Sequence, residues 1–129
     1  SMVMSGDQYI EQIAVIGDQR KFVSALIVPA YSLLEKYAEE KGLAVGSRKE
    51  LVRNKEILRL IETHIEENQK NLASYEKIKR FTLLSEPFTM GAELTDTLKL
   101  RRSVILKKYA DPIEKMYEEA SNMWGSNPV

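Results

Sequence analysis

Apolar residues in the first quarter of the chain fall into two short runs. Residues 9–16 and 22–28 are rich in β-branched side chains, and the polar link between them, 17–21, has the length of a hairpin connection. This pattern predicts an antiparallel β-hairpin. The stretch 25–28 has no polar alternation, which is typical of a central strand covered on both faces.

Helical signals follow the hairpin. The Ser-Leu-Leu-Glu sequence at 32–35 has the pattern of a capping box, and Gly42 stands where a left-handed C-terminal cap belongs. A second capping-box pattern at 47–50 precedes apolar residues at helical spacing. The expected helices are 33–41 and 48–71, the second broken near Asn54.

The second half of the chain predicts one more strand and two more helices. Residues 78–84 have the pattern of a strand, and a loop of low periodicity covers 88–97. Apolar spacing around Val104 predicts a short helix, and the sequence 111–114 offers an Asp N-cap, a first-position proline and a third-position Glu for a last helix. The element order predicts an α+β fold, in which about four helices pack on a small three-stranded, largely antiparallel sheet.

Composition and charge narrow the function classes. The 129 residues fit one domain, and 43% hydrophobic with 29% charged residues is the composition of a soluble globular protein. Nineteen Lys and Arg balance nineteen Asp and Glu, so no overall positive field is available to hold nucleic acid. The absence of cysteine and the single histidine, His64, argue against a transition-metal site. We expect no metal site, no nucleic-acid partner and a cytoplasmic location.

Residues 1–7 look partly like an expression remnant and 124–129 like a tail, which leaves 8–123 as the domain.

One segment departs from this neutral background. Residues 99–108 contain no acid and five cations, which are Lys99, Arg101, Arg102, Lys107 and Lys108. A solvated helix face explains this pattern, with the last two lysines suited to a helix C-terminus. Arg101 and Arg102, however, lie near a helix start, where the macrodipole disfavours cations, and this points to a bound anion or an acidic partner. Spacing leaves both interpretations open.

The other polar and aromatic residues carry no candidate site. Packing and solvation explain His64, the paired acids and the scattered aromatics.

The same region carries a resemblance to a known family. Residues 91–102 (GAELTDTLKLRR) closely resemble the C-terminal signature of bacterial long-chain fatty acid CoA ligases, which belong to the adenylate-forming superfamily. Residues 10–18 and 20–29 are similar to that family's hairpin, and 75–81 to its third strand. The similarity keeps the family's order and spacing from about residue 9 to 117.

The resemblance implies a fold and a function. The chain would be the C-terminal lid of an AMP-forming ligase that converts a fatty acid, ATP and CoA to acyl-CoA, AMP and pyrophosphate. The family's catalytic lysine falls at Lys99, where it would reach the acyl carboxylate and the α-phosphate during adenylation. Arg101 and Arg102 are the candidates for contacting anionic groups or docking to the large domain.

The resemblance also places the partners outside these residues. No cofactor is expected in this fragment, because ATP, Mg²⁺, CoA and the fatty acid would bind the full-length enzyme through a large N-terminal domain of the same chain. The isolated lid is expected to be inactive, and a peripheral membrane association of the full-length enzyme stays open.

Two residues depart from the family pattern. Many superfamily members have glycine immediately before the lysine, whereas this chain has Leu98, which is usual in the long-chain relatives and supports that branch. Asp96 stands where proline is frequent in the long-chain branch. Two alternatives stay open beside the first interpretation. One is a free-standing α+β interaction module with a basic docking loop. The other is the lid of a related acyl-adenylate ligase with a different acyl acceptor.

Overall fold

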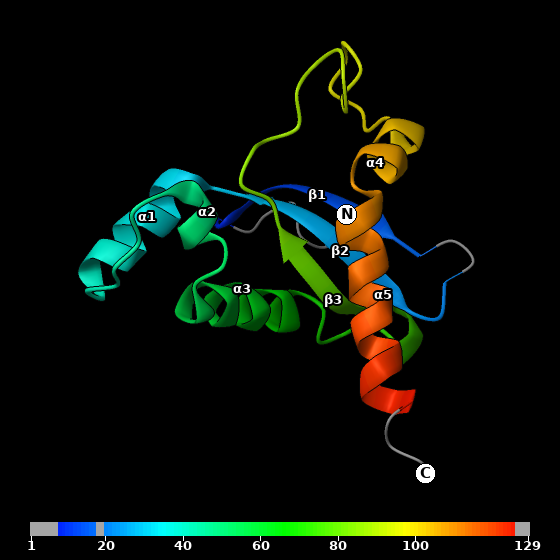
Figure 1. Ribbon diagram of the computed structural model, residues 1–129, viewed down its shortest axis with the longest axis horizontal. Coiled ribbons are helices and arrows are strands. Elements are labelled where there is room, and N and C mark those ends of the chain that lie inside the picture. Colours follow the sequence, from blue (N-terminus) through cyan, green and yellow to red (C-terminus); the bar gives the residue numbers. More distant parts are fainter. Residues whose placement is uncertain (1–7, 18–19, 126–129) are drawn as a thin grey trace. The chain divides into compact units, whose positions relative to one another are not determined.

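The computed structural model describes residues 8–17 and 20–125 and confirms the predicted order of elements (Figure 1). The expected remnant at 1–7 and the last part of the expected tail, 126–129, lie outside the described residues. The chain divides into two compact units, Ser1–Pro87 and Phe88–Val129, which we call the sheet unit and the C-terminal unit. The elements are β1 (Ile10–Ile16), β2 (Val23–Pro29), α1 (Tyr31–Glu40), α2 (Arg48–Leu51), α3 (Lys55–Asn68), the 3₁₀ helix η2 (Ser74–Glu76), β3 (Ile78–Leu83), α4 (Arg102–Lys108) and α5 (Ala110–Gly125).

The sheet of the sheet unit is mixed, with β2 in the centre. Strands β1 and β2 pair antiparallel, with Ile13 opposite Ile27, and this confirms the predicted hairpin. Strands β2 and β3 pair in parallel, with Ala25 opposite Phe81, so only one of the two pairings is antiparallel. A parallel pair needs a long crossover, and the three helices between β2 and β3 provide it.

The core of the sheet unit lies on the central strand and on one stripe of α3. Every residue of β2 after Val23 is buried, which confirms that this strand is covered on both faces. Helix α1 continues from the end of β2, and α3 lies beneath the sheet in the view of Figure 1. The stripe of α3 consists of Ile57, Ile61 and Ile65, all buried at a spacing of four residues. Each such side chain contributes about 1.5–3 kcal/mol relative to an exposed position.

The start of α1 differs from the prediction, whereas its end agrees. The helix begins at Tyr31 with Ala30 as its N-cap and without a side-chain cap, so the predicted capping box at 32–35 is wrong. The earlier start buries Tyr31, whose hydroxyl donates to the Leu84 carbonyl oxygen at 2.6 Å. At the other end Gly42 has the predicted left-handed conformation, with φ +67°.

The long helical stretch after residue 47 is broken at Asn54, as predicted. The hydroxyl of Ser47 accepts from the Glu50 N–H at 3.2 Å and caps the four-residue α2. Asn54 then caps α3, since its Oδ1 accepts from the Glu56 N–H at 2.9 Å and the Ile57 N–H at 3.3 Å. The two caps thus explain why one apolar stripe is divided between two helices.

Helix α3 ends at Asn68, three residues before the predicted end. The next residue, Gln69, is buried, and its side-chain amide makes two hydrogen bonds to the backbone of Ile78, at 2.9 Å to its N–H and 3.2 Å to its carbonyl oxygen. This pair joins the end of the helix to the first residue of β3.

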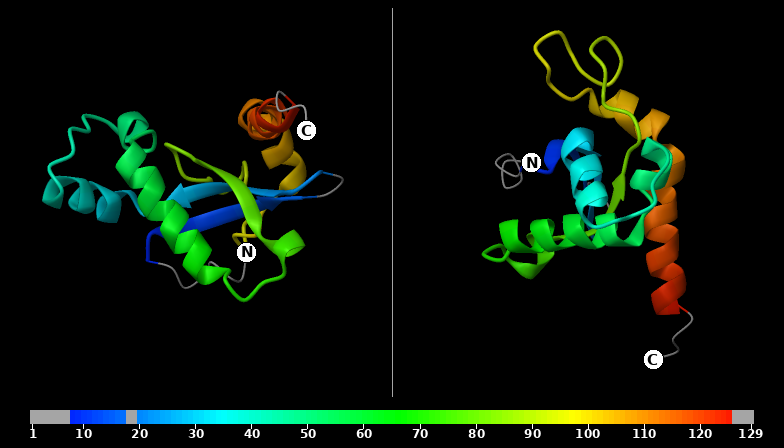
Figure 2. Two further views of the ribbon diagram at one scale, coloured as in Figure 1. Left: turned by 90° about the horizontal axis from the view of Figure 1, so that it is seen from below. Right: turned by 90° about the vertical axis from the view of Figure 1, so that its left-hand side faces the viewer.

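The C-terminal unit consists of the irregular segment 88–101 followed by α4 and α5 (Figure 2). The predicted short helix is confirmed as α4. Helix α5 begins at Ala110, so Asp111 is not its N-cap as predicted but lies in its first turn. No helix within the described residues combines the length and the apolar character needed to cross a bilayer. The buried apolar residues of this unit include Phe88, Leu94, Ile105, Ile113 and Met116.

Candidate functional site

The residues of the predicted signature form a short β-hairpin, residues 93–101, which we call the Lys99 hairpin. Leu94 and Leu100 pair antiparallel across it. On one side of this pair, the Arg101 N–H donates to the Glu93 carbonyl oxygen at 2.7 Å. On the other side, the Thr95 N–H donates to the Lys99 carbonyl oxygen at 2.8 Å. Lys99 therefore begins the returning strand of a small hydrogen-bonded ladder.

The turn of the Lys99 hairpin is closed by Thr95 and strained at Leu98. The Thr95 hydroxyl accepts from the Lys99 N–H at 3.0 Å, and the Thr95 carbonyl oxygen accepts from the Leu98 N–H at 2.9 Å. Leu98 has φ +62°, the left-handed region that glycine adopts without a steric penalty. This conformation costs a residue with a side chain roughly 1–2 kcal/mol, and it matches the glycine that many members of the wider superfamily have at this position.

The three predicted site residues are all exposed at the junction of the Lys99 hairpin and α4. Lys99 lies in the hairpin, Arg101 is the N-cap residue of α4, and Arg102 is the first residue of α4. Across the described part of the chain, none of these three side chains makes a hydrogen bond or an ion pair. The structure thus places them close together in the chain, although no interaction joins their side chains.

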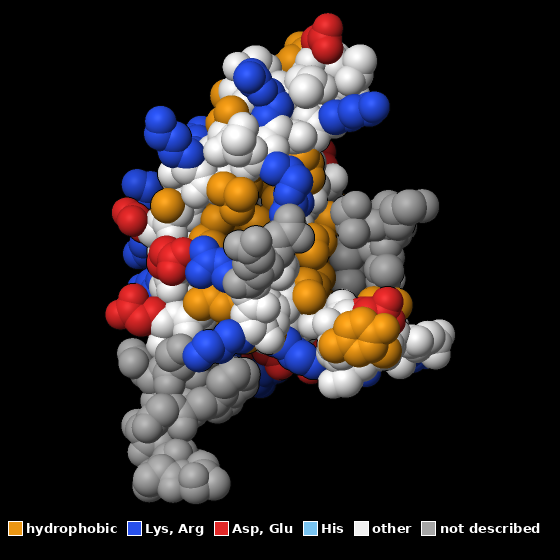
Figure 3. All heavy atoms as spheres, turned by 90° about the vertical axis from the view of Figure 1, so that its right-hand side faces the viewer, with side chains coloured by type: hydrophobic (Ala, Val, Ile, Leu, Met, Phe, Trp, Pro, Cys, Tyr) orange, Lys and Arg blue, Asp and Glu red, His pale blue; other side chains and the backbone are white. Residues whose placement is uncertain are grey.

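The surface around this junction is basic. Figure 3 shows Lys and Arg side chains over the upper part of the molecule, with few acidic side chains among them. Segment 99–108 itself contributes five exposed cations and no acid. Such a surface would attract an anionic group.

The first residue of the Lys99 hairpin, Glu93, carries a buried carboxylate that the sequence did not single out. The Glu93 side chain has no exposed area, and its Oε1 accepts from the Thr89 N–H and the Thr89 hydroxyl, both at 3.2 Å. Its Oε2 accepts from the Lys108 ammonium at 2.5 Å and the Tyr109 hydroxyl at 2.8 Å. We call Glu93, Thr89, Lys108 and Tyr109 the Glu93 cluster.

The Glu93 carboxylate is held in its ionised form. Burial raises the pKa of Glu93, but the hydrogen bonds from Lys108, Tyr109 and Thr89 outweigh it and lower this pKa to about 2. The Lys108 side chain is about half exposed, at 51%, so one partner of the ion pair keeps contact with water. The ion pair therefore links the first residue of the Lys99 hairpin to the last residue of α4.

Sequence spacing gave little sign of this cluster. Lys108 was interpreted through its position in the last turn of α4, which the structure confirms, but its partner lies 15 residues earlier, outside the basic segment. One signal was available. Glu93 is the only charged residue between Pro87 and Asp96, and it stands beside Leu94 in a stretch rich in uncharged and apolar residues. A lone carboxylate in such a context often requires a buried partner.

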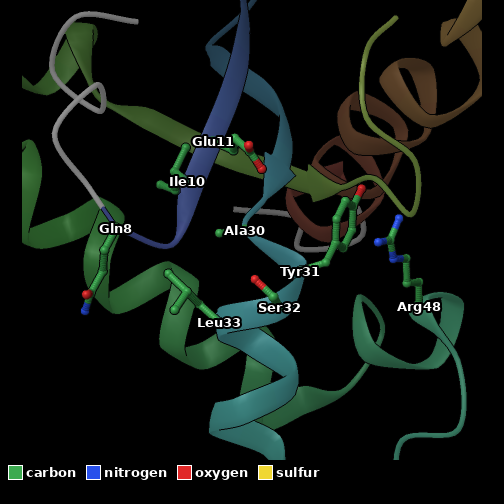
Figure 4. A pocket seen from close by; sticks show the side chains of 8 residues that line it. All are labelled: Gln8, Ile10, Glu11, Ala30, Tyr31, Ser32, Leu33 and Arg48. Carbon is green, nitrogen blue, oxygen red and sulfur yellow. The ribbon is translucent and has the colours of Figure 1, made fainter.

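The sheet unit contains a separate hollow of about 440 Å³. The Arg48 guanidinium lies 4.3 Å from the centre of the Tyr31 ring at one side of it (Figure 4). Burial raises the pKa of Tyr31 to about 12, with Arg48 opposing and Glu11 and Glu86 adding to the rise. The phenol thus stays neutral and serves as the hydrogen-bond donor to Leu84. None of the predicted site residues lines the hollow, which is formed by Gln8, Ile10, Glu11, Ala30, Tyr31, Ser32, Leu33 and Arg48.

The remaining candidate groups are accounted for by packing. His64 is half-buried on α3, with its ring centre 4.9 Å from that of Tyr9 in an edge-to-face arrangement, as expected for a histidine at the edge of the core. The described residues contain no group of three or more His, Asp or Glu side chains that could hold a metal ion.

Comparison with solved structures defines the class of protein. The adenylation domain of a carboxylate reductase from Mycobacterium chelonae has a TM-score of 0.69 and 28% sequence identity to this chain, and the match covers 90% of this chain and 17% of the other. The chain therefore has the fold of part of an adenylation domain.

Comparison of sequences gives the family. Residues 1–121 match the family of AMP-binding enzyme C-terminal domains, and the chain belongs to this family. Long chain acyl-CoA synthetase 8 of Arabidopsis thaliana is 31% identical over 118 residues, which are 88% of this chain and 16% of that protein. Long-chain-fatty-acid–CoA ligase FadD15 of Mycobacterium tuberculosis is 29% identical over 112 residues, 85% of this chain and 19% of that protein. The chain thus spans less than a fifth of the length of either relative.

Proposed function

We propose that this chain is the C-terminal lid of an ATP-dependent long-chain fatty acid CoA ligase, and that Lys99 is its catalytic residue in the adenylation step. In that step the fatty acid carboxylate attacks the α-phosphate of ATP, an acyl-adenylate forms and pyrophosphate leaves. CoA then displaces AMP. The large domain that binds the nucleotide and the acyl chain would complete the site.

The observation that carries this proposal is the state of the Lys99 side chain. It is exposed on a hydrogen-bonded hairpin and has no internal partner in the described residues, so its ammonium is available to an outside anion. A lysine buried in the core or held in an internal ion pair could not serve in this way. The names of the relatives support a fatty acid as substrate and CoA as acceptor.

The expected contribution is electrostatic. An ammonium about 4 Å from developing negative charge is worth roughly 4 kcal/mol at an effective dielectric constant near 20. If this interaction is made mainly in the transition state, it corresponds to roughly three decades in rate. Lysine suits the task because its charge is compact and its stem is flexible. No proton transfer and no covalent bond are required of it.

Substitution of Lys99 in a polypeptide that joins this lid to its large domain tests the proposal. We expect Lys99→Ala to lower the rate of pyrophosphate release roughly 10³-fold, while thioester formation from preformed acyl-adenylate stays nearly intact. Lys107→Ala is the matched control, since Lys107 is an exposed lysine of the same basic segment and should keep the wild-type rate. Equal loss of both half-reactions in Lys99→Ala would refute the assigned role.

Arg101 and Arg102 support a second, separable role. Their exposed guanidinium groups have no internal partner in the described residues, so they are available to an anionic group of the substrates or to an acidic surface of the large domain. For an isolated lid added to the large domain in trans, Arg102→Ala should weaken association, and the loss should shrink as salt is raised. Association that is insensitive to both salt and this substitution would exclude the docking role.

A free-standing interaction module is the alternative that uses the same basic surface. Full activity of the Lys99→Ala enzyme, together with salt-sensitive binding of the isolated chain to an acidic protein, would favour that alternative. The lid proposal instead predicts that the isolated chain releases no pyrophosphate from ATP and a fatty acid, and that activity appears only when the large domain is present.

A further inference from the structure

Glu93 joins three parts of the C-terminal unit. Its backbone carbonyl oxygen accepts from the Arg101 N–H, which forms the base of the Lys99 hairpin. Its side chain accepts from Thr89 in the incoming segment and from Lys108 and Tyr109 at the end of α4. One residue therefore sets the position of the hairpin base relative to the helix that follows it.

The hydrogen-bonded ladder links the position of Lys99 to that of Glu93 at the hairpin base. The successive cross-strand pairs are Glu93 with Arg101, Leu94 with Leu100, and Thr95 with Lys99. Lys99 is thus two pairs away from the anchored base. A shift of Glu93 would move the whole ladder, because the pairs are linked by backbone hydrogen bonds.

Packing gives the far end of the hairpin little support. Residues 96–99 are exposed, and Leu98 is 65% exposed, so the tip has no core of its own. Buried contacts lie at the base, where Leu94 and Glu93 are buried and the Tyr109 ring packs edge-to-face on Phe88 at 6.0 Å between ring centres. The base therefore determines where the tip is held.

We propose that Glu93 is a positioning residue, whose buried carboxylate fixes the Lys99 hairpin on α4 so that the Lys99 ammonium is placed for adenylation. This inference rests on the proposed function, in which Lys99 is the catalytic residue. Glu93 touches no substrate itself. A misplacement of about 1 Å can cost roughly 10²-fold in rate, which sets the size of the expected effect.

The test measures adenylation in a polypeptide that joins the lid to its large domain. We expect Glu93→Ala to lower kcat for pyrophosphate release about 10²-fold, with a much smaller change in KM for ATP and fatty acid, since the loss is confined to the transition state. The Lys99→Ala/Glu93→Ala double variant should be no slower than Lys99→Ala, because Glu93 acts through Lys99. Deuterium exchange of the backbone amides in 94–101 should accelerate in Glu93→Ala.

Two further variants separate positioning from general loss of structure. Tyr109→Phe removes a single hydrogen bond of the cluster and should lower kcat by a smaller factor in a folded protein. Ile113→Ala opens a cavity at a buried position of α5, outside the hairpin, and should lower the unfolding temperature without lowering kcat.

The outcomes distinguish this inference from the proposed function. If Lys99→Ala loses adenylation but Glu93→Ala and Tyr109→Phe keep the wild-type kcat, positioning by Glu93 is overturned while the proposed function stands. If the two rate losses multiply in the double variant, Glu93 acts independently of Lys99 and the inference is again overturned. A Lys99→Ala enzyme at the wild-type rate would refute the proposed function itself.

Discussion

Leu98 holds a backbone conformation that its side chain disfavours, directly beside the lysine on which the function depends. Its φ of +62° places a large exposed side chain in the left-handed region. The hydrogen bonds on both sides of it, from Leu98 N–H and Lys99 N–H to Thr95, hold the turn in place. Strain of this kind persists only where the surroundings determine the backbone, as they do here.

Replacing Leu98 by glycine should therefore stabilise the C-terminal unit. We expect Leu98→Gly to raise the free energy of unfolding by up to about 1 kcal/mol, because relief of the left-handed penalty exceeds the added entropy of the unfolded chain. Urea denaturation measures the change. The matched control is Leu106→Gly, an exposed leucine inside α4, which should lose about 1 kcal/mol. A loss of equal size in both variants would show that Leu98 carries no strain.

Sequence reasoning could identify single residues of the site only where the signal is local in the chain. Lys99 was identified through the motif around it, since the pattern of 91–102 is local in the chain. Glu93 lies within the same motif, but nothing in its neighbourhood along the chain marks it as an anchor. Its partners Lys108 and Tyr109 lie 15 and 16 residues later, and only the folded turn between them brings the groups together. Local patterns contain no information about such a contact.

At the scale of elements, helix caps could be predicted where the partner is local. Asn54 was predicted as a break in the helical stretch, and its side chain satisfies two N–H groups at the start of α3. The predicted start of α1 failed for the opposite reason. Tyr31 is included in the helix because its hydroxyl reaches Leu84, 53 residues away, and this contact outweighs the local capping pattern at 32–35.

The sheet shows the same division between local and distant information. The hairpin of β1 and β2 follows from two β-rich runs and a short polar link. The pattern of β3, in contrast, is equally compatible with parallel and antiparallel pairing, so its direction could not be predicted from its residues. The crossover through α1, α2 and α3 decides the direction, and the resulting sheet is mixed.

The cap of α3 provides a prediction at this scale. Asn54→Ala should lower the free energy of unfolding by about 1 kcal/mol, because two N–H groups at the helix start lose their acceptor. Asn54→Asp should retain the wild-type stability, since a carboxylate accepts the same hydrogen bonds and favours the helix N-terminus. Asn71→Ala, at an exposed position after α3, should change stability by less than about 0.5 kcal/mol. If Asn54→Ala and Asn71→Ala have equal effects in chemical denaturation, the cap makes no net contribution.

Because the charges of the whole molecule balance, the pH dependence of its stability is determined mainly by individual buried groups. Nineteen basic and nineteen acidic residues cancel near neutral pH, so self-repulsion contributes little to the pH dependence there. The exposed ion pair of Glu67 and Lys70, with both side chains more than 60% exposed, adds little to stability. The buried Glu93 is different, because its ionised form is strongly preferred by the folded state.

Glu93 should accordingly make the protein sensitive to acid. The pKa of Glu93 is about 2 in the folded state and 4.5 by reference, so the unfolded state takes up the proton first as pH falls. The contribution of Glu93 is therefore fully present above pH 4.5 and is lost as pH falls through about 2. A shift of this size corresponds to roughly 3 kcal/mol.

The measurement compares unfolding free energies of the wild type and Glu93→Gln from neutral pH down to about 2. The wild type should be the more stable protein at neutral pH, and the difference should shrink through this acid range because glutamine cannot titrate. Glu67→Gln is the control. The Lys70 hydrogen bond lowers the pKa of Glu67, but this ion pair is exposed and adds little to stability, so the substitution should change the acid dependence much less than Glu93→Gln does. A wild-type advantage over Glu93→Gln that stays constant down to the lowest pH would contradict an ionised Glu93. The inference that an ionised Glu93 anchors the Lys99 hairpin would then be wrong, because a protonated Glu93 could not form the ion pair with Lys108.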